Sequence, residues 1–434
     1  MRCGMLTNMQ GDVRREFVLL IIIGIVVRFF FWLSYEPVYF ADSPHYEWLA
    51  EYIINWDFSA YEGIRTPIYS LLLIMGGINW YGVWLWQSLL GILSSLLLYD
   101  LVRNEGGKWA FFAGLLPTIQ INLLANEANI LTETLATFLL LLAFWLWQRG
   151  QLKEWPTSIT LTFGLVASFA GLTRPILLLL PCLAFLLALV DKRARRLQNL
   201  AAITLPFLLL AGSWSYFNWL TVGYFGPTTL TGYNLSRHSG AFVEHAPDEF
   251  ATIRDIFLTY RDEENGDHTA AIWQARQDMQ AATGYSYAEL SQELTRMSLT
   301  LFWERKADYL RSVFNAWTQF WQKTAVLRLG TLKPGVIGVI VAMIWWFQSR
   351  VLLGLDLIFW LLVGQAIWHG FKSRSVTGGP YQLAILLVMV TSLAQAFLEY
   401  GENARYAIPY QPLIWYVVLV GTATFLRSHL PTRA

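Results

Sequence analysis

The sequence has few charged residues and few cysteines. Asp, Glu, Lys and Arg make up 14% of its 434 residues, against about a quarter in ordinary soluble domains. The formal net charge is +1 and no tract is dense in Lys and Arg, which excludes the electrostatic pattern of a nucleic-acid-binding protein. Cys3 lies in the N-terminal tail and Cys182 lies inside an apolar run. No disulfide or metal-thiolate framework is therefore implied.

Apolar residues are abundant instead, at 55% of the chain, and the sequence holds 21 Trp, 20 Tyr and 27 Phe. Aromatic rings gather at membrane-water interfaces, so a chain with this many of them is expected to cross a membrane several times. Runs long enough to cross about 30 Å of hydrocarbon occupy residues 17–33, 79–102, 109–125, 129–148, 157–173, 175–190, 198–221, 334–347, 351–370, 381–399 and 407–426. The short run 334–347 is either a span or an interfacial or re-entrant segment. We predict an all-α polytopic membrane protein with about 10–12 transmembrane helices, the first of them uncleaved.

Lys and Arg alternate between the loops that join these runs. They gather in the N-terminal tail and in residues 103–108, 149–153 and 191–196, whereas the opposite side has only Arg65 and Arg174. The positive-inside rule therefore predicts a cytoplasmic N-terminus. The side of the C-terminus stays open, because eleven runs would place it outside and Arg427 favours the cytoplasm.

The predicted sides of the loops divide the chain into three parts. Residues 1–221 form an N-terminal transmembrane module whose first outer loop is 34–78, residues 222–333 form an extracytoplasmic helical domain, and residues 334–434 form a C-terminal transmembrane module. Ser286-x-x-Glu289 predicts the start of a helix through a capping box. The aromatic residues between 302 and 321 predict a helix that lies along the membrane interface.

Two polar clusters lie in the first outer loop. Helical spacing would place Asp42 and Tyr46 on one face, where Asp42 is either a base or the N-cap of a helix with Pro44 in its first turn. Arg65 is the only basic residue of this loop. It is either a phosphate ligand or an arginine that snorkels to the interface.

Two further clusters lie at the outer ends of later runs. Glu127 and Glu133 begin the fourth run, where two acids are costly unless they face a cavity or a cation; the alternative is that both are helix N-terminal acids. Glu402, Arg405 and Tyr406 precede the last run. Arg405 offers planar donors for a phosphate, and the alternative is a salt-bridged turn. Arg28 and Arg174 are either site residues or anchors.

In order, these segments form a recognisable series. They are Asp42-x-x-x-Tyr46-x-x-x-Ala50, Arg65-Thr-Pro-x-Tyr69, Thr132-Glu133, Leu172-Thr-Arg-Pro175 and Glu402-Asn-Ala-Arg-Tyr406-x-x-Pro409. The series resembles bacterial GT-C membrane glycosyltransferases of the ArnT/protein-mannosyltransferase-like branch, the glycosyltransferase 39-type family. The resemblance implies a GT-C-like helical bundle. It also implies an enzyme that moves a sugar from a polyprenyl-phosphate donor to a lipid, glycan or protein acceptor outside the cytoplasmic membrane, with Asp42 as the catalytic carboxylate.

The resemblance also assigns roles to the other polar residues. Arg405, Arg65 and Arg174 would bind the donor phosphate, and Glu133, Tyr46, Glu402 and Tyr406 would orient substrates. Glu133 is also a candidate ligand for a divalent metal ion. Two departures leave the metal and the donor sugar open: Ser43 stands where many relatives have a second acid, and Thr66-Pro67 replaces a double proline.

Two other classes of function remain as alternatives. A polytopic transporter or lipid flippase also has many spans and interior charges, although no internal repeat is found in this sequence. A noncatalytic membrane scaffold would tolerate loss of Asp42. If the chain is an enzyme, Asp42, Glu133, Arg405 and at least one of Arg65 and Arg174 should converge on one cavity open to the outer side.

Overall fold

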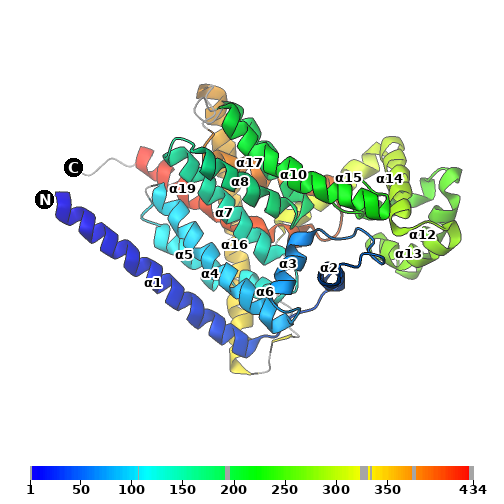
Figure 1. The fold of residues 1–434 in the computed structure, drawn as a ribbon, viewed down its shortest axis with the longest axis horizontal. Helices are drawn as coiled ribbons and strands as arrows, with labels where there is room; N and C mark the ends of the chain where they lie inside the picture. Colours follow the sequence, from blue (N-terminus) through cyan, green and yellow to red (C-terminus); the bar gives the residue numbers. More distant parts are fainter. Residues whose placement is uncertain are drawn as a thin grey trace.

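A computed structural model of the chain describes residues 2–105, 107–190, 196–322, 331–332, 335–373 and 378–429. Within these residues the structure is helical and has no strand, apart from one isolated bridge between Val38 and Asn129. Figure 1 shows a bundle of long helices with a group of shorter helices at one end. The prediction of an all-α fold is confirmed for the described part of the chain.

The bundle and the first loop contain most of the helices. They are α1 (Arg2–Ser34), α2 (Ser43–Asn55), α3 (Pro67–Met75), α4 (Trp80–Asn104), α5 (Ala110–Ile119), α6 (Ile121–Ala128), α7 (Glu133–Leu152), α8 (Thr157–Gly171), the 3-10 helix η1 (Pro175–Leu178), α9 (Leu179–Val190), α10 (Leu197–Val222), α16 (Val336–Ser373), α17 (Pro380–Leu398), α18 (Asn403–Tyr406) and α19 (Gln411–His429).

Six helical segments of the described chain are long and apolar enough to cross a membrane. They are 12–34, 80–104, 197–222, 338–368, 380–398 and 403–427. Three shorter apolar segments, 110–119, 157–171 and 175–190, accompany them. The structure thus has the helices of a membrane protein, and the number of crossings stays a prediction.

The predicted division into separate runs at 334–347 and 351–370 is wrong. One continuous helix, α16, covers the described residues of both runs. The polar residues between the runs, Gln348 to Arg350, do not break a helix. The Arg350 guanidinium packs over the Trp346 ring, 5.4 Å from its centroid. Figure 1 shows the start of α1 and the end of α19 on the same side of the bundle. Which side of the membrane they face stays a prediction.

The predicted single run 109–125 is instead two helices. Gln120 adopts an extended backbone between α5 and α6, and its side chain accepts a hydrogen bond from the Leu123 amide. Gln348 of α16 completes the break, because it donates to the Ile119 carbonyl and accepts from the Ile121 amide, both at 2.8 Å. A side chain from a distant helix therefore satisfies the backbone groups that the break exposes.

The segment after α10 forms the group of shorter helices seen at one end of Figure 1. These helices are α11 (Thr231–Ser239), α12 (Ala251–Glu263), α13 (His268–Thr283), α14 (Tyr287–Glu304) and α15 (Lys306–Trp321). They share a core that includes Phe257, Met279 and Leu294. The capping box of Ser286 and Glu289 is present at the start of α14, which confirms that prediction.

The aromatic helix α15 joins this group to the bundle. The Tyr309 hydroxyl donates to the Phe397 carbonyl at 2.9 Å, and the Trp317 indole donates to the Ser392 hydroxyl at 3.2 Å. Both acceptors belong to α17. The helices α11 to α15, called the outer helices after the side of the membrane predicted for them, are thereby attached to the end of α17, immediately before the residues around Arg405.

A buried ion pair connects α1, α4 and α6. Arg28 donates two hydrogen bonds to Glu127, at 2.9 and 2.5 Å, and both residues are almost fully buried. Glu127 lies in the last turn of α6, so it is not an N-terminal acid of α7. A side chain at Gly91 of α4 would collide with both partners. Gly91 therefore provides the space in which this pair forms.

We expect Gly91→Ala to lower the melting temperature of the purified protein in detergent. The added methyl group would force the ion pair apart, and overpacking of this kind costs about 1–3 kcal/mol. Gly212→Ala in α10 is the matched control, because its new Cβ meets nothing within 4 Å and alanine favours a helix. Equal melting temperatures for the two variants would contradict the expected role of Gly91.

Candidate active site

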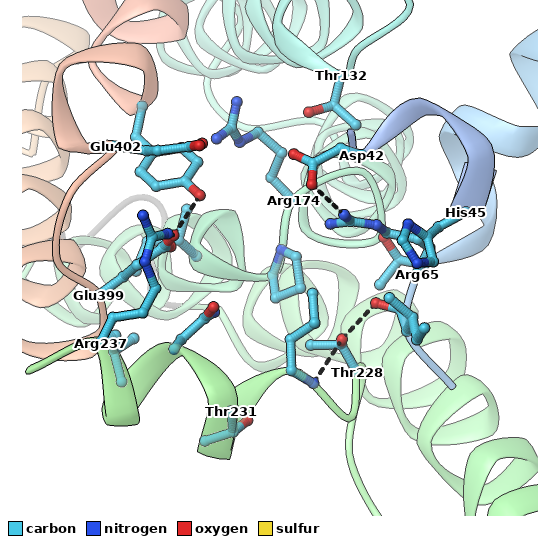
Figure 2. Close-up of a pocket in the computed structure, with 18 of the residues that line it drawn as sticks. Asp42, His45, Arg65, Thr132, Arg174, Thr228, Thr231, Arg237, Glu399 and Glu402 are labelled. Atoms are coloured by element: carbon cyan, nitrogen blue, oxygen red, sulfur yellow. Dashed lines mark hydrogen bonds and ion pairs between the residues drawn. The ribbon is translucent and has the colours of Figure 1, made fainter. Parts of the chain in front are cut away.

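A cavity of about 470 Å³ lies where the first loop, η1, α17, α18 and the outer helices meet. Figure 2 shows Asp42 and Arg65 on one wall and Arg237 and Glu399 on another. Among the predicted site residues, the cavity is lined by Asp42, Tyr46, Arg65, Arg174, Glu402, Arg405 and Tyr406. Glu133 lies directly behind Arg405 and Arg174. All the predicted site residues are thus brought together.

Asp42 is held between two arginines. It occupies the N-cap position of α2, but its side chain makes no capping hydrogen bond. Instead it accepts from Arg65 and from Arg405, each at 2.7 Å. Burial opposes the charge of Asp42, but the two guanidinium groups outweigh it and hold the pKa of this carboxyl well below its usual range. Asp42 is therefore ionised at neutral pH.

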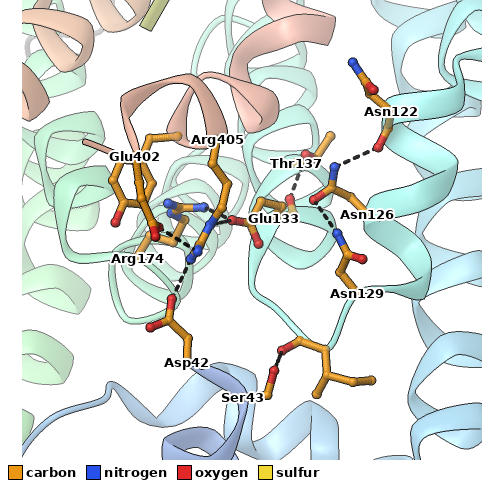
Figure 3. A network of polar contacts seen from close by, with 12 residues as sticks. Asp42, Ser43, Asn122, Asn126, Asn129, Glu133, Thr137, Arg174, Glu402 and Arg405 are labelled. Atoms are coloured by element: carbon orange, nitrogen blue, oxygen red, sulfur yellow. Dashed lines mark hydrogen bonds and ion pairs between the residues drawn. The ribbon is translucent and has the colours of Figure 1, made fainter. Parts of the chain in front are cut away.

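Arg405 joins three carboxylates. Its Nε donates to Glu133 at 2.8 Å, and its two terminal nitrogens donate to Glu402 at 2.8 Å and to Asp42 at 2.7 Å. Figure 3 shows Arg405 between these groups. The three nitrogens of one guanidinium group thus make all three contacts at once. The salt-bridged turn with Glu402 is present, and it is part of the site.

Glu133 is neutralised by arginines. It is fully buried and forms a second ion pair with Arg174, at 3.0 Å. Among the described residues, no group of three His, Cys, Asp or Glu side chains is placed to hold a metal ion. A divalent cation at Glu133 would lie beside two guanidinium groups and be repelled by both. The residues present therefore do not fit the predicted metal ion.

Two tyrosines pack against arginines of the cavity. The Arg65 guanidinium lies over the Tyr46 ring, 4.8 Å from its centroid, and that of Arg174 lies over Tyr406 at 4.7 Å. Such stacking orients a guanidinium without consuming its hydrogen-bond donors. Tyr46 and Tyr406 thus hold the arginines that face the cavity.

Ser43, which stands at the position of an expected second acid, has a structural role. It is fully buried, and its hydroxyl donates to the Ile130 carbonyl at 2.8 Å and accepts from the Phe40 amide at 3.0 Å. Gln87 of α4 supports the same turn through hydrogen bonds to the carbonyls of Glu127 and Asn129. These contacts set the distance between the Asp42 segment and the start of α7.

We expect Ser43→Ala to lower the free energy of unfolding by about 1–3 kcal/mol, because the buried Ile130 carbonyl loses its hydrogen bond. The control is Ser158→Ala, at an exposed position of α8. Denaturation curves of both variants measure the difference, and an unchanged curve for Ser43→Ala would contradict it.

Glu47 does not take part in the site. It accepts from the Tyr39 hydroxyl at 2.5 Å and from the Trp80 indole at 3.0 Å, away from the cavity.

His45 does line the cavity. Burial and the charge of Arg65 lower the pKa of His45 to about 4, so it is neutral at pH 7.

A second buried ion pair closes the opposite wall, and no sequence pattern pointed to its arginine. Arg237 of α11 donates to Glu399 at 2.6 Å, and Glu399 also accepts from the Tyr406 hydroxyl at 2.7 Å. Gly401, with a φ of +108°, lets the chain pass close to Arg237. Arg237 lies within the long hydrophilic segment, where no spacing distinguished it from surface residues.

Comparison with protein-family models found no match, and comparison with curated proteins found none. The function is therefore inferred from the cavity. The cavity lies at one end of the bundle. Figure 1 shows α2 and α3 at that end, near the outer helices and away from the start of α1.

Proposed function

We propose that this protein is an integral-membrane glycosyltransferase with a GT-C-like bundle of about 10–12 transmembrane helices. It moves a sugar from a polyprenyl-phosphate donor to a lipid, glycan or protein acceptor on the outer face of the cytoplasmic membrane. The observation that carries the proposal is an ionised carboxylate, Asp42, held between Arg65 and Arg405 in a cavity at the ends of apolar helices.

The arginines suit the phosphate of the donor. Five arginines line the cavity, namely Arg65, Arg174, Arg237, Arg276 and Arg405, against three carboxylates, namely Asp42, Glu399 and Glu402. Glu133, behind Arg405 and Arg174, and Glu62, near Arg276, balance the remaining charge. A phosphate would therefore bind by taking guanidinium donors from these carboxylates. As the bond from sugar to phosphate breaks, negative charge grows on the departing phosphate, and planar donors stabilise it.

Apolar residues at the cavity suit the lipid part of the donor. Ile176, Leu230 and Leu398 belong to the lining. Leu398, at the end of α17, is also 44% exposed on the surface of the protein. An apolar route from the cavity to the bilayer at this position would admit a polyprenyl tail.

Asp42 would remove the proton from the acceptor hydroxyl. The acceptor oxygen forms a bond to the anomeric carbon, the bond from that carbon to the phosphate oxygen breaks, and polyprenyl phosphate leaves. The hydroxyl proton passes to Asp42. Direct displacement of this kind inverts the anomeric configuration.

The low pKa of Asp42 is compatible with this role. In an oxocarbenium-like transition state the hydroxyl loses its proton late, when bonding to carbon has made it acidic, so a weak base is sufficient. A donor phosphate that shares Arg65 and Arg405 would also withdraw positive charge from Asp42. Binding of the donor would thereby raise the basicity of the carboxylate.

The proposal is tested with membranes that contain the protein and a panel of radiolabelled polyprenyl-phosphate hexoses and pentoses. We expect one donor to be consumed, with release of polyprenyl phosphate. Membranes without the protein are the control. A transporter, a flippase or a scaffold would leave every donor intact, and that result would refute the glycosyltransferase.

A further inference from the structure

An aromatic stack lies at the outer end of the cavity. Trp273 of α13 stacks on Tyr233 with 5.6 Å between centroids, and Tyr233 packs on Tyr287 at 4.5 Å. Tyr233 and Tyr287 are buried, whereas Trp273 lines the cavity and is 40% exposed. Trp273 is therefore a rigidly backed aromatic surface that is open to a ligand.

Arg276 lies on the same face of α13, three residues after Trp273. Its guanidinium lies over the Tyr287 ring, 5.5 Å from the centroid. Its ion pair with the partly exposed Glu62 spans 3.8 Å, which is too long for a hydrogen bond. The stack orients Arg276, while its donors stay available to an anion.

The other arginines of the lining are bound more tightly by the protein. Arg65, Arg237 and Arg405 each donate to a carboxylate at distances between 2.6 and 2.8 Å. A ligand anion would have to compete with those carboxylates. Arg174 pairs with Glu133 at 3.0 Å and its side chain is only 9% exposed. Arg276 is 26% exposed and faces only the loose pair with Glu62, so it is the lining arginine that an outside anion reaches most easily.

Hydroxyl and amide groups lie between this end and the rest of the cavity. Thr231 and Asn234 of α11 belong to the lining. Figure 2 shows Thr231 and Arg237 on the α11 side, across the cavity from Asp42 and Arg174. Polar groups of this kind pair with the hydroxyls of a sugar, which has both an apolar face and a polar rim.

We infer that the outer end of the cavity, formed by Trp273, Arg276, Thr231 and Asn234, is a subsite for an acidic sugar of the acceptor. Trp273 stacks on the face of the ring, and Arg276 binds its carboxylate or phosphate. The inference rests on the proposed function, because it assigns the donor to the end at Asp42. It names the acceptor class as an anionic glycan or glycolipid.

The test is binding of simple sugars to the purified full-length protein in detergent, measured by saturation-transfer NMR without any donor. The probes are glucuronic acid, glucose 6-phosphate and neutral glucose, and the two acids distinguish a carboxylate from a phosphate. We expect at least one acid to bind about tenfold or more tightly than glucose, as befits one charged hydrogen-bonded contact. Equal binding of all three would overturn the subsite.

Two variants locate the binding. Arg276→Gln should remove the preference for the acid, and Trp273→Ala should weaken all three probes. Arg296→Gln is the control, because Arg296 is an exposed arginine on α14 of the same outer helices. Acid binding that is unchanged in both Arg276→Gln and Trp273→Ala would overturn the inference, and thermal melts verify that each variant is folded.

The outcomes also separate this inference from the proposed function. Acid binding that depends on Arg276 and Trp273, in a protein that consumes no donor, would support the subsite and refute glycosyl transfer. Consumption of a donor by a protein whose sugar binding is unaffected by both variants would support transfer and refute the subsite.

Discussion

Asp42→Asn is expected to lower the rate of sugar transfer by about 10²- to 10⁴-fold, the contribution of a positioned base. Asparagine keeps the size of the side chain but cannot take the proton of the acceptor hydroxyl. Transfer from the donor identified in the membrane assay measures the effect. Asp57→Asn is the matched control, because Asp57 is an exposed acid in the segment between α2 and α3, close in sequence to Asp42.

The same variant should show a pH-dependent loss of stability. The pKa of Asp42 is lowered in the folded protein, so its charge stabilises the fold above the unfolded pKa of about 4 and this stabilisation is lost as the pH falls below it. The melting temperature of Asp42→Asn should therefore lie below that of the wild type at pH 7 and approach it under acid conditions. Wild-type turnover in a folded Asp42→Asn protein would show that Asp42 is not the base.

Arg405→Lys is expected to lower the transfer rate about ten- to hundredfold or more although it conserves charge. The guanidinium bonds Glu133, Glu402 and Asp42 at once. An ammonium is a point charge that cannot reproduce this fork, so both the departing phosphate and the three carboxylates lose contacts. We expect a lower melting temperature as well as a lower rate.

Binding of the product separates the two effects. Polyprenyl phosphate is titrated into wild type, Arg405→Lys and the surface control Arg296→Lys at a temperature where all are folded. Weaker binding to Arg405→Lys alone supports a phosphate ligand. A normal affinity and a normal rate with a lowered melting temperature would leave Arg405 with a structural role only.

Properties that depend on neighbouring residues were predictable from the sequence. The apolar runs predicted a helical membrane protein, because the length of a run decides whether it can cross a bilayer. Ser286 and Glu289 predicted the start of α14, because a capping box involves residues only three apart. Charge alternation between loops placed Asp42, Glu133, Arg174 and Arg405 on one side, and the structure brings them together.

Features that depend on distant residues were not predictable in this way. The break at Gln120 is stabilised by Gln348, and the position of Asp42 relative to Glu133 depends on Ser43 and Ile130. Nothing in the sequence distinguished Arg237 from other polar residues of its segment, because its partner Glu399 is 162 residues away in the chain.

The sequence by itself determined the helical, membrane-protein class of the fold, since this follows from composition and run length. The sidedness of the loops stays a prediction from their charge, and the role of Asp42 stays a prediction from the resemblance to GT-C glycosyltransferases. Only the tertiary structure decided which charges pair. Arg405 could have bound Glu402 alone, three residues away, but packing of α7 and the first loop brings Glu133 and Asp42 within reach of its other nitrogens. The energy of a buried charge depends on its neighbours in space, and the chain order does not contain that information.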